Sequence, residues 1–196
     1  SSVAYQHAGF SVHDEAFAMA NFAKRHAIQR VAIVSTDNDF SQLQVASYIN
    51  LWETELGYTA HTVTLPQDIK PGDVALVDLK TKLAEQPYEM LLIAASASDA
   101  QTIRPYLDIS TPTLAFSNIH EITNDSNVKL TAVRFVDIPF LIDARQFAYY
   151  HEKSAELTSN EQKRWFALGV DCLQLLVASN HTANTDKVID GLTGKI

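Results

Sequence analysis

The stretch Arg30-Val-Ala-Ile-Val-Ser-Thr-Asp-Asn-Asp-Phe40 decides the fold of this chain. Its residues 31–34 form a short, partly β-branched apolar run, which is typical of a strand buried on both faces of a parallel sheet. A polar loop follows, and Asp39 stands at the expected helix N-cap with Gln42 three residues later, as in a capping box. We expect the next helix to end at Gly57 in the left-handed conformation. The stretch therefore predicts one β-loop-α unit.

The same unit recurs along the chain. Further strands are predicted at residues 59–65, 90–95, 111–117 and 130–135, with helical patterns or polar loops between them. The run at 90–95 is the most apolar of these, so we expect it at the centre of the sheet. Alternating strands and helices predict an α/β fold with a doubly wound, mostly parallel sheet.

Several residues should begin or interrupt the other helices. We expect further helix caps at Asp73, at Ser98 with Gln101, and at Thr158 with Glu161. Pro105 lies within the helical pattern after Ser98, and a proline at that depth predicts a kink. The last helix, over residues 162–179, is strongly amphipathic, and its apolar stripe consists of Phe166, Val170, Leu173 and Val177.

Polar residues follow the predicted strands at the edge where α/β proteins bind ligands. Loops after the carboxyl ends of parallel strands form this edge. The candidate ligand-binding residues there are Asp37, Asn38, Ser96, Ser98 and Ser117. Helix capping and solvation of the loops also explain these residues. Asp137, before Ile138 and Pro139, is interpreted either as a hinge carboxylate or as part of a turn.

Composition and motifs argue against several classes of function. A formal net charge of −8 makes nucleic acid an improbable partner, because neutralising phosphates needs a basic face. The 6 glycines form neither a dinucleotide-binding nor a Walker spacing, and the sequence has no Gly-x-Ser-x-Gly elbow. None of the 7 histidines forms the i, i+4 pair of a helical metal site. We therefore expect no metal, no cofactor and no enzymatic activity.

The chain has a single cysteine, Cys172, which rules out an internal disulfide framework. It lies in an apolar helical run with Leu168 and Leu176, so we expect a packed, inert thiol. No run approaches the roughly 18 apolar residues that a membrane-spanning helix needs. The sequence has no initiator methionine and no signal sequence, and it stops abruptly after Gly191-Leu-Thr-Gly194-Lys-Ile196. We expect it to be a piece of a longer protein, from which targeting cannot be deduced.

Several local patterns, taken in order, resemble those of the LppC/LpoA family. The most specific are Ala100-Gln-Thr-Ile-Arg104-Pro-Tyr-Leu107 and Ala132-Val-Arg-Phe-Val-Asp137-Ile-Pro-Phe-Leu141. These resemble the family patterns Ala-x-x-Ile-(Arg/Lys)-Pro-x-Leu and Gly-Val-Arg-Phe-x-Asp-x-Pro-Trp-Leu. Supporting matches are Phe10-Ser-Val-His-Asp-Glu-Ala16, the stretch at 30–40, the segment 164–171, and Gly191-Leu-Thr-Gly194.

Three departures from the family patterns accompany these matches. Ala132 stands for the usual glycine, and Phe140 stands for the usual tryptophan. The end of the predicted strand over residues 111–117 reads Phe116-Ser117, followed by Asn118, where the family more usually has Thr-Ser. These departures leave the fold assignment intact and bear on the details of the partner.

The resemblance implies a bacterial outer-membrane lipoprotein that faces the periplasm. Family members activate class A penicillin-binding proteins, the bifunctional peptidoglycan synthases, by protein–protein contact and without catalysis. Their C-terminal domain resembles the two-lobed type I periplasmic solute-binding fold and follows a helical-repeat domain. Residues 1–143 would then form lobe two, and residues 144–196 a segment that returns to a partial lobe one. The membrane would be reached only through an N-terminal lipid anchor absent from this chain.

Two other functions compete with this one. A solute-binding protein of the same fold would need convergent polar groups from both lobes, and its pocket would use the five residues named above. An α/β enzyme would need a nucleophile–base pair or a metal cluster, and the sequence offers neither. If the partner strands of lobe one are absent, part of the apolar stripe on the last helix should be uncovered, which would promote association.

Overall fold

A computed structural model of the chain describes residues 11–121, 130–143, 145–181 and 190–194. The chain divides into two compact units, with the division between Val136 and Asp137. The larger unit comprises Val12–Val136, and the described part of the smaller one consists of Ser11 and the described residues from Asp137 onward. Among the described residues, no helix combines the length and hydropathy needed to cross a membrane.

The larger unit is built on a five-stranded sheet in the order β2-β1-β3-β4-β5, and all of its pairings are parallel. The strands are β1 (Arg30–Thr36), β2 (Thr59–Leu65), β3 (Met90–Ala94), β4 (Thr113–Ala115) and β5 (Val133–Phe135). All five residues of β3 are buried, and this strand lies at the centre of the sheet. The predicted parallel α/β sheet and its central strand are therefore confirmed.

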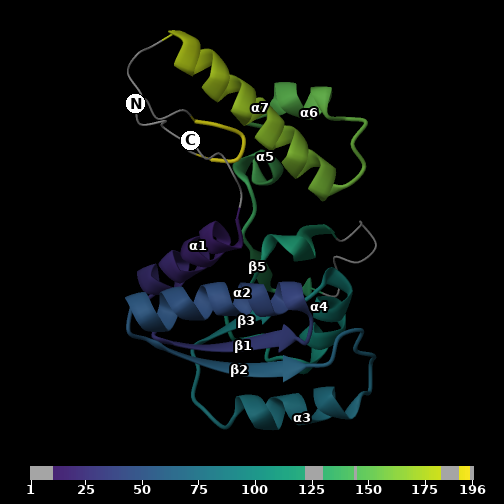
Figure 1. Cartoon of the computed structure of the whole chain (residues 1–196). Helices are drawn as coiled ribbons and strands as arrows, with labels where there is room; N and C mark the ends of the chain where they lie inside the picture. Colours follow the sequence, from purple (N-terminus) through teal and green to yellow (C-terminus); the bar gives the residue numbers. More distant parts are fainter. Residues whose placement is uncertain (1–10, 122–129, 144, 182–189, 195–196) are drawn as a thin grey trace. The chain divides into compact units, whose positions relative to one another are not determined.

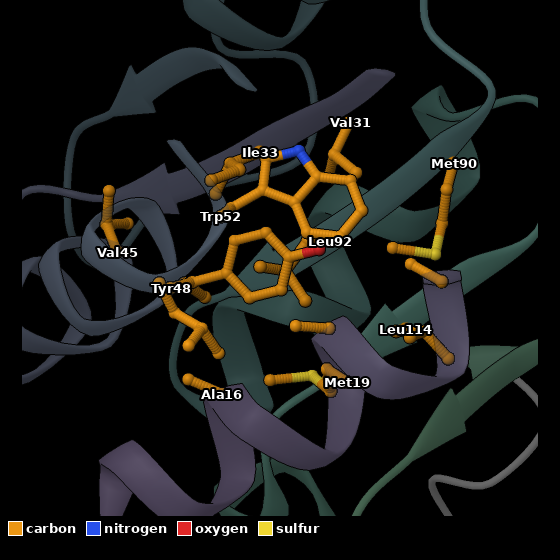
Figure 2. Packing of buried hydrophobic residues seen from close by; sticks show 14 of the residues in the cluster. Ala16, Met19, Val31, Ile33, Val45, Tyr48, Trp52, Met90, Leu92 and Leu114 are labelled. Carbon is orange, nitrogen blue, oxygen red and sulfur yellow. The ribbon is translucent and has the colours of Figure 1, made fainter. Parts of the chain in front are cut away.

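Two helices cover one face of the sheet (Figure 1). They are α1 (Val12–Arg25) and α2 (Asp39–Ile49), which continues into a π-helical turn, η1 (Asn50–Glu55). Tyr48 and Trp52 stack at 5.5 Å between ring centroids and pack with Met19 of α1 against this face (Figure 2). These large aromatic side chains account for much of the buried face of α2 and η1.

The opposite face packs against α3 (Val74–Leu83), α4 (Ala97–Ile103) and the short 3₁₀ helix η2 (Arg104–Tyr106). Strand side chains alternate between the two faces. Ile33 and Leu92 accordingly point to the α1–α2 side, and Val34 and Ile93 to the α3–α4 side. Burial on both faces is the physical reason why these strands appear in the sequence as continuous apolar runs.

The smaller unit contains α5 (Pro139–Ile142), α6 (Ala148–Lys153) and α7 (Asn160–His181). Its buried core consists of Ile138, Phe140, Phe147, Ala167 and Leu192. The Phe140 ring stacks on His151 at 4.3 Å between centroids, and the Phe140 carbonyl accepts a hydrogen bond from His151 Nε2 at 2.8 Å.

Three helices begin at a different residue from the predicted one. Asn38, not Asp39, caps α2, because its backbone is still extended and its Oδ1 accepts the Ser41 N–H at 2.9 Å. Ser96, not Ser98, caps α4 and receives the Asp99 N–H at 3.1 Å. Ser159 Oγ, rather than Thr158, accepts the Gln162 N–H at 3.1 Å at the start of α7. Each capping signal was real but displaced by one or two positions.

Two of the remaining helix predictions have different outcomes. Gly57 has φ of +69°, and the Tyr58 N–H bonds to the Trp52 carbonyl at 3.1 Å, so the predicted left-handed helix end is confirmed. Pro105 does not kink a longer helix. Instead α4 ends at Ile103, and the proline lies in the 3₁₀ turn that follows, where the missing N–H costs little.

Candidate functional site at the carboxyl edge of the sheet

The predicted site residues follow three strands that end at one edge of the sheet. The register places Ser35 beside Ala94 and Ile93 beside Ala115, so β1, β3 and β4 finish side by side. The arrowheads of β1 and β2 in Figure 1 mark this edge. The structure therefore brings the five predicted residues to the same edge of the larger unit.

The loop after β1 is organised by Asn38. Its Nδ2 donates to Thr36 Oγ1 at 2.8 Å, while its Oδ1 caps α2. The hydroxyls of Thr36 and Ser41 lie 3.1 Å apart in the same buried network. The Asp37 side chain is exposed. The side-chain amide of Asn38 therefore forms hydrogen bonds within the loop and to the start of α2, whereas Asp37 faces solvent.

The loop after β3 is held by a reciprocal cap. Ser96 Oγ accepts the Asp99 N–H and lies 2.9 Å from Asp99 Oδ2, to which it donates. The hydroxyls of Ser96 and Ser98 lie 3.0 Å apart. Asp99 is buried and also accepts the Ile69 N–H at 3.2 Å. This reciprocal cap fixes α4 against the chain that follows β2.

The 3₁₀ helix after β4, η3 (Ser117–Glu121), is tied to α1 by a buried carboxylate. The Ser117 backbone N–H and hydroxyl donate to the two oxygens of Glu15, at 2.6 and 2.9 Å. Glu15 is 5% exposed and Ser117 is 6% exposed. Ser117 is one of the five residues predicted from the sequence, but its partner Glu15 is not. A glutamate in the first turn of a helix is normally explained by the helix dipole, and only the tertiary fold reveals that it is buried.

A second set of hydrogen bonds at this edge, formed by Asn118 and Gln44, was not predicted from the sequence. Asn118 Nδ2 donates to the Ala95 carbonyl at 2.7 Å, and Gln44 Nε2 donates to Asn118 Oδ1 at 3.0 Å. Gln44 is fully buried, and its Oε1 has no hydrogen-bond partner among the residues that the structure describes. One turn later, burial raises the pKa of the Tyr48 hydroxyl far above its ordinary value, so the hydroxyl stays neutral.

The chemistry of this edge is that of a rigid scaffold. Each of the three serines shares a hydrogen bond with a carboxylate or another hydroxyl, and Ser117 is nearly inaccessible. Within the described ranges, no group of three or more His, Cys, Asp or Glu side chains is placed to hold a metal ion. The contacts connect α1, α2, α4 and the strand ends to one another.

The smaller unit carries two buried acidic anchors. Asp137 forms a two-pronged ion pair with Arg164, with N–O distances of 3.0 and 2.8 Å, and its side chain is fully buried. Asp137 also accepts the Ile138 N–H at 2.8 Å, and it is the first residue after the division between the two units, so the hinge and turn interpretations both stay open. Asp171 accepts the backbone N–H groups of Leu192 and Thr193, both at 2.7 Å, which holds the Gly191-Leu-Thr-Gly194 segment on α7.

Two expectations for α7 have opposite outcomes. Cys172 is exposed, so the predicted packed thiol is wrong. The buried face of α7 is narrow and contains Ala167 and Asp171. Cys172 lies outside this face. The expected partial exposure of the apolar stripe is confirmed, because Leu173 and Val177 are 61% and 51% exposed.

The parallel sheet, the helices on both faces and the polar carboxyl edge define a type I periplasmic-binding-protein-like α/β unit. Solved structures share this fold. A "putative branched-chain amino acid ABC transporter" from Chromobacterium violaceum matches with a TM-score of 0.79 and 19% identity over 95% of this chain and 60% of its own. Full-length LpoA from Haemophilus influenzae matches with a TM-score of 0.71 and 20% identity over 95% of this chain and 35% of its own.

The LpoA C-domain from Haemophilus influenzae, a regulator of PBP1A, also has a TM-score of 0.71 and 20% identity, and 59% of it is covered. This chain thus spans less than two thirds of each of these structures. The model of the "LppC putative lipoprotein" family matches residues 4–196. The chain belongs to this family. Among curated proteins, none matches the chain.

Proposed function

We propose that this chain is part of a non-catalytic activator of class A penicillin-binding proteins, which regulates peptidoglycan synthesis by protein–protein contact. The observation that carries the proposal is the family match over residues 4–196. The fold shared with the LpoA C-domain, a regulator of PBP1A, supports it. The internal hydrogen bonds of the serines at the carboxyl edge agree with a protein that recognises a partner and does not react with a substrate.

The domain assignment and the location belong to the same proposal. We assign residues 1–143 to lobe two of a periplasmic-binding-protein-like domain and residues 144–196 to a segment that returns to lobe one. The protein would be anchored by an N-terminal lipid to the outer membrane, on its periplasmic side. Membership of a lipoprotein family supports this location.

The direct test measures the cognate synthase with and without the full-length protein. Rates of glycan polymerisation and peptide cross-linking should rise when the protein is added in excess over the synthase. A matched control is the same protein without the segment that contains this chain. Unchanged rates, together with no detectable binding, would overturn the proposal.

A second candidate function is binding of a small polar solute. Fold similarity to a structure described as an amino-acid transporter component favours it. In that case Asp37, Asn38, Ser96, Ser98 and Ser117 would face the ligand. Thermal-shift measurements of the full-length protein with amino acids and muropeptides distinguish the two functions, because a ligand that binds the folded state raises Tm. A reproducible rise with one of these compounds would favour the solute binder.

A further inference from the structure

A hollow of about 640 Å³ lies at the amino edge of the sheet, at the opposite end of the strands from the predicted site. Its walls come from the last turns of α1 and from the segments that lead into β1, β3, β4 and β5. All of these segments belong to the unit Val12–Val136. Small-molecule sites usually occupy roughly 300–1,000 Å³, so the hollow can hold a ligand of that size.

Apolar side chains form most of the surface of the hollow. Ile28 and Leu114 are buried beneath it, and Phe22 is half-buried along one side. Ile109 is 64% exposed at the rim, where it would lose contact with water if a ligand entered. Burial of such a side chain is the usual source of affinity for an apolar group.

One cation is available in the hollow. The Arg134 guanidinium lies over the Phe22 ring, 5.6 Å from its centroid, and Phe22 stacks on His26 at 4.1 Å. Because a carbonyl can only accept, His26 Nδ1 carries the proton of its 2.8 Å bond to the Phe22 oxygen, which fixes the imidazole. In the part of the chain that the structure describes, Arg134 forms no ion pair.

Glu89, the carboxylate that lines the hollow, is already engaged. Glu89 accepts the backbone N–H groups of Gln29 and Arg30 at 2.9 and 3.1 Å, and Arg30 Nη2 at 3.0 Å. The hydrogen bond from Gln29 is the main reason why the pKa of Glu89 is lowered, so the carboxylate stays charged. The Glu89 carboxylate repels negative charge, and the Arg134 guanidinium is the group in the hollow that can pair with an anion. This combination favours a ligand with one negative charge over a phosphate dianion.

We propose that the amino-edge hollow is a binding site for the carboxylate end of a short apolar peptide. The carboxylate pairs with the forked guanidinium of Arg134, a geometry that accepts two oxygens at once. The apolar side chains of the ligand pack against Ile28, Ile109 and Leu114. This site is separate from the carboxyl edge, and it does not depend on the function proposed above.

The test is a titration of the 196-residue chain, labelled with ¹⁵N, with N-acetyl-Leu-Leu and with its C-terminal amide, followed by NMR. The free acid should give saturable shifts at Arg134 and at residues 109–111, with an affinity about tenfold higher than that of the amide. Arg134→Gln should abolish this difference between acid and amide. Ile109→Ser should weaken both ligands by a similar factor.

Arg145→Gln is the matched control, because it removes one exposed positive charge from outside the hollow. It should leave both affinities within twofold of the parent values. Arg134→Lys keeps the charge but not the fork, and it should retain only part of the preference for the acid. Equal affinities for acid and amide, a preference that survives Arg134→Gln, or no saturable binding would each overturn the proposal.

Discussion

Ala132 holds its backbone at φ of +60°, in the left-handed region where a Cβ atom is strained. Glycine, which the family pattern quoted above would place here, adopts this conformation without strain. Ala132→Gly should therefore raise the free energy of unfolding by roughly 0.5–1 kcal/mol, measured by urea titration.

Ala18→Gly is the matched control for this substitution, because Ala18 is an exposed residue in the interior of α1. Glycine there should lower the free energy of unfolding by about 1 kcal/mol. If both substitutions lower the free energy of unfolding to the same extent, the backbone at Ala132 is not strained.

Gly191 is needed for space. A Cβ atom there would lie 2.6 Å from Asp171 Oδ2 and 2.7 Å from its carboxyl carbon. Gly191→Ala should displace the segment that Asp171 holds and lower the free energy of unfolding by about 1–3 kcal/mol. The thermal midpoint of the purified chain measures this loss.

Gly169→Ala tests the specificity of that effect in the same unit. Gly169 lies within α7, and its added Cβ would meet nothing within 4 Å. Alanine should stabilise the helix by roughly 0.5–1 kcal/mol. A neutral Gly191→Ala would show that the close approach to Asp171 is not required.

Single residues were predictable from the sequence when a local rule governed them. Gly57 ends its helix as expected, and each capping motif was found within one or two positions. Glu15 was not found, because its partner Ser117 is 102 residues away in the sequence. Cys172 was placed on the wrong side of α7 since the apolar pattern of that helix is wider than its buried face.

Between elements of the larger unit, a buried hydrogen bond ties the segment after β4 to α1. Ser117→Ala removes the hydroxyl that donates to Glu15 at 2.9 Å in a buried setting. The free energy of unfolding should fall by roughly 1.5–3 kcal/mol, the range for hydrogen bonds to charged groups. Urea titration followed by circular dichroism checks this value.

Ser98→Ala is the control, since Ser98 is also at the carboxyl edge but is exposed. Its substitution should change stability by less than about 0.5 kcal/mol. A loss at Ser98 as large as that at Ser117 would contradict the view that Glu15 makes the difference.

The ion pair between Asp137 and Arg164 joins the start of the smaller unit to α7. Arg164→Leu leaves the fully buried Asp137 carboxylate without its 2.8 Å partner. Breaking such a pair costs roughly 3–5 kcal/mol, and the thermal midpoint should fall accordingly.

The exposed pair of Arg30 and Glu89 supplies the comparison, because its side chains are 51% and 38% exposed. Arg30→Leu should cost no more than about 1 kcal/mol. Similar losses for the two arginines would mean that burial does not determine the strength of the Asp137 pair.

Elements were easier to predict than their lengths. The sequence predicts all five strands, but β4 and β5 contain only three residues each in the structure, where 111–117 and 130–135 were expected. Pro112 removes a backbone donor just before β4, and the left-handed Ala132 turns the chain just before β5. Apolar patterns do not show where such interruptions end the hydrogen-bond ladder.

For the whole molecule, the fold and the family could be predicted from the sequence, and the details of a binding site could not. Parallel strands bring Asn38, Ser96 and Ser117 to one edge, as the alternating pattern indicated. Their hydrogen-bond partners depend on tertiary contacts with α1 and α2, which periodicity does not encode. The amino-edge hollow has no sequence signature, because its walls come from segments spread over more than 100 residues, between Phe22 and Arg134.

We propose that this chain belongs to a protein that acts by contact with a synthase. Isothermal titration calorimetry of the full-length protein with the purified class A penicillin-binding protein tests it most directly, with an amino-acid panel titrated in parallel. We expect saturable binding of the synthase and no heat from the amino acids. Saturable binding of an amino acid without binding of the synthase would contradict the proposal.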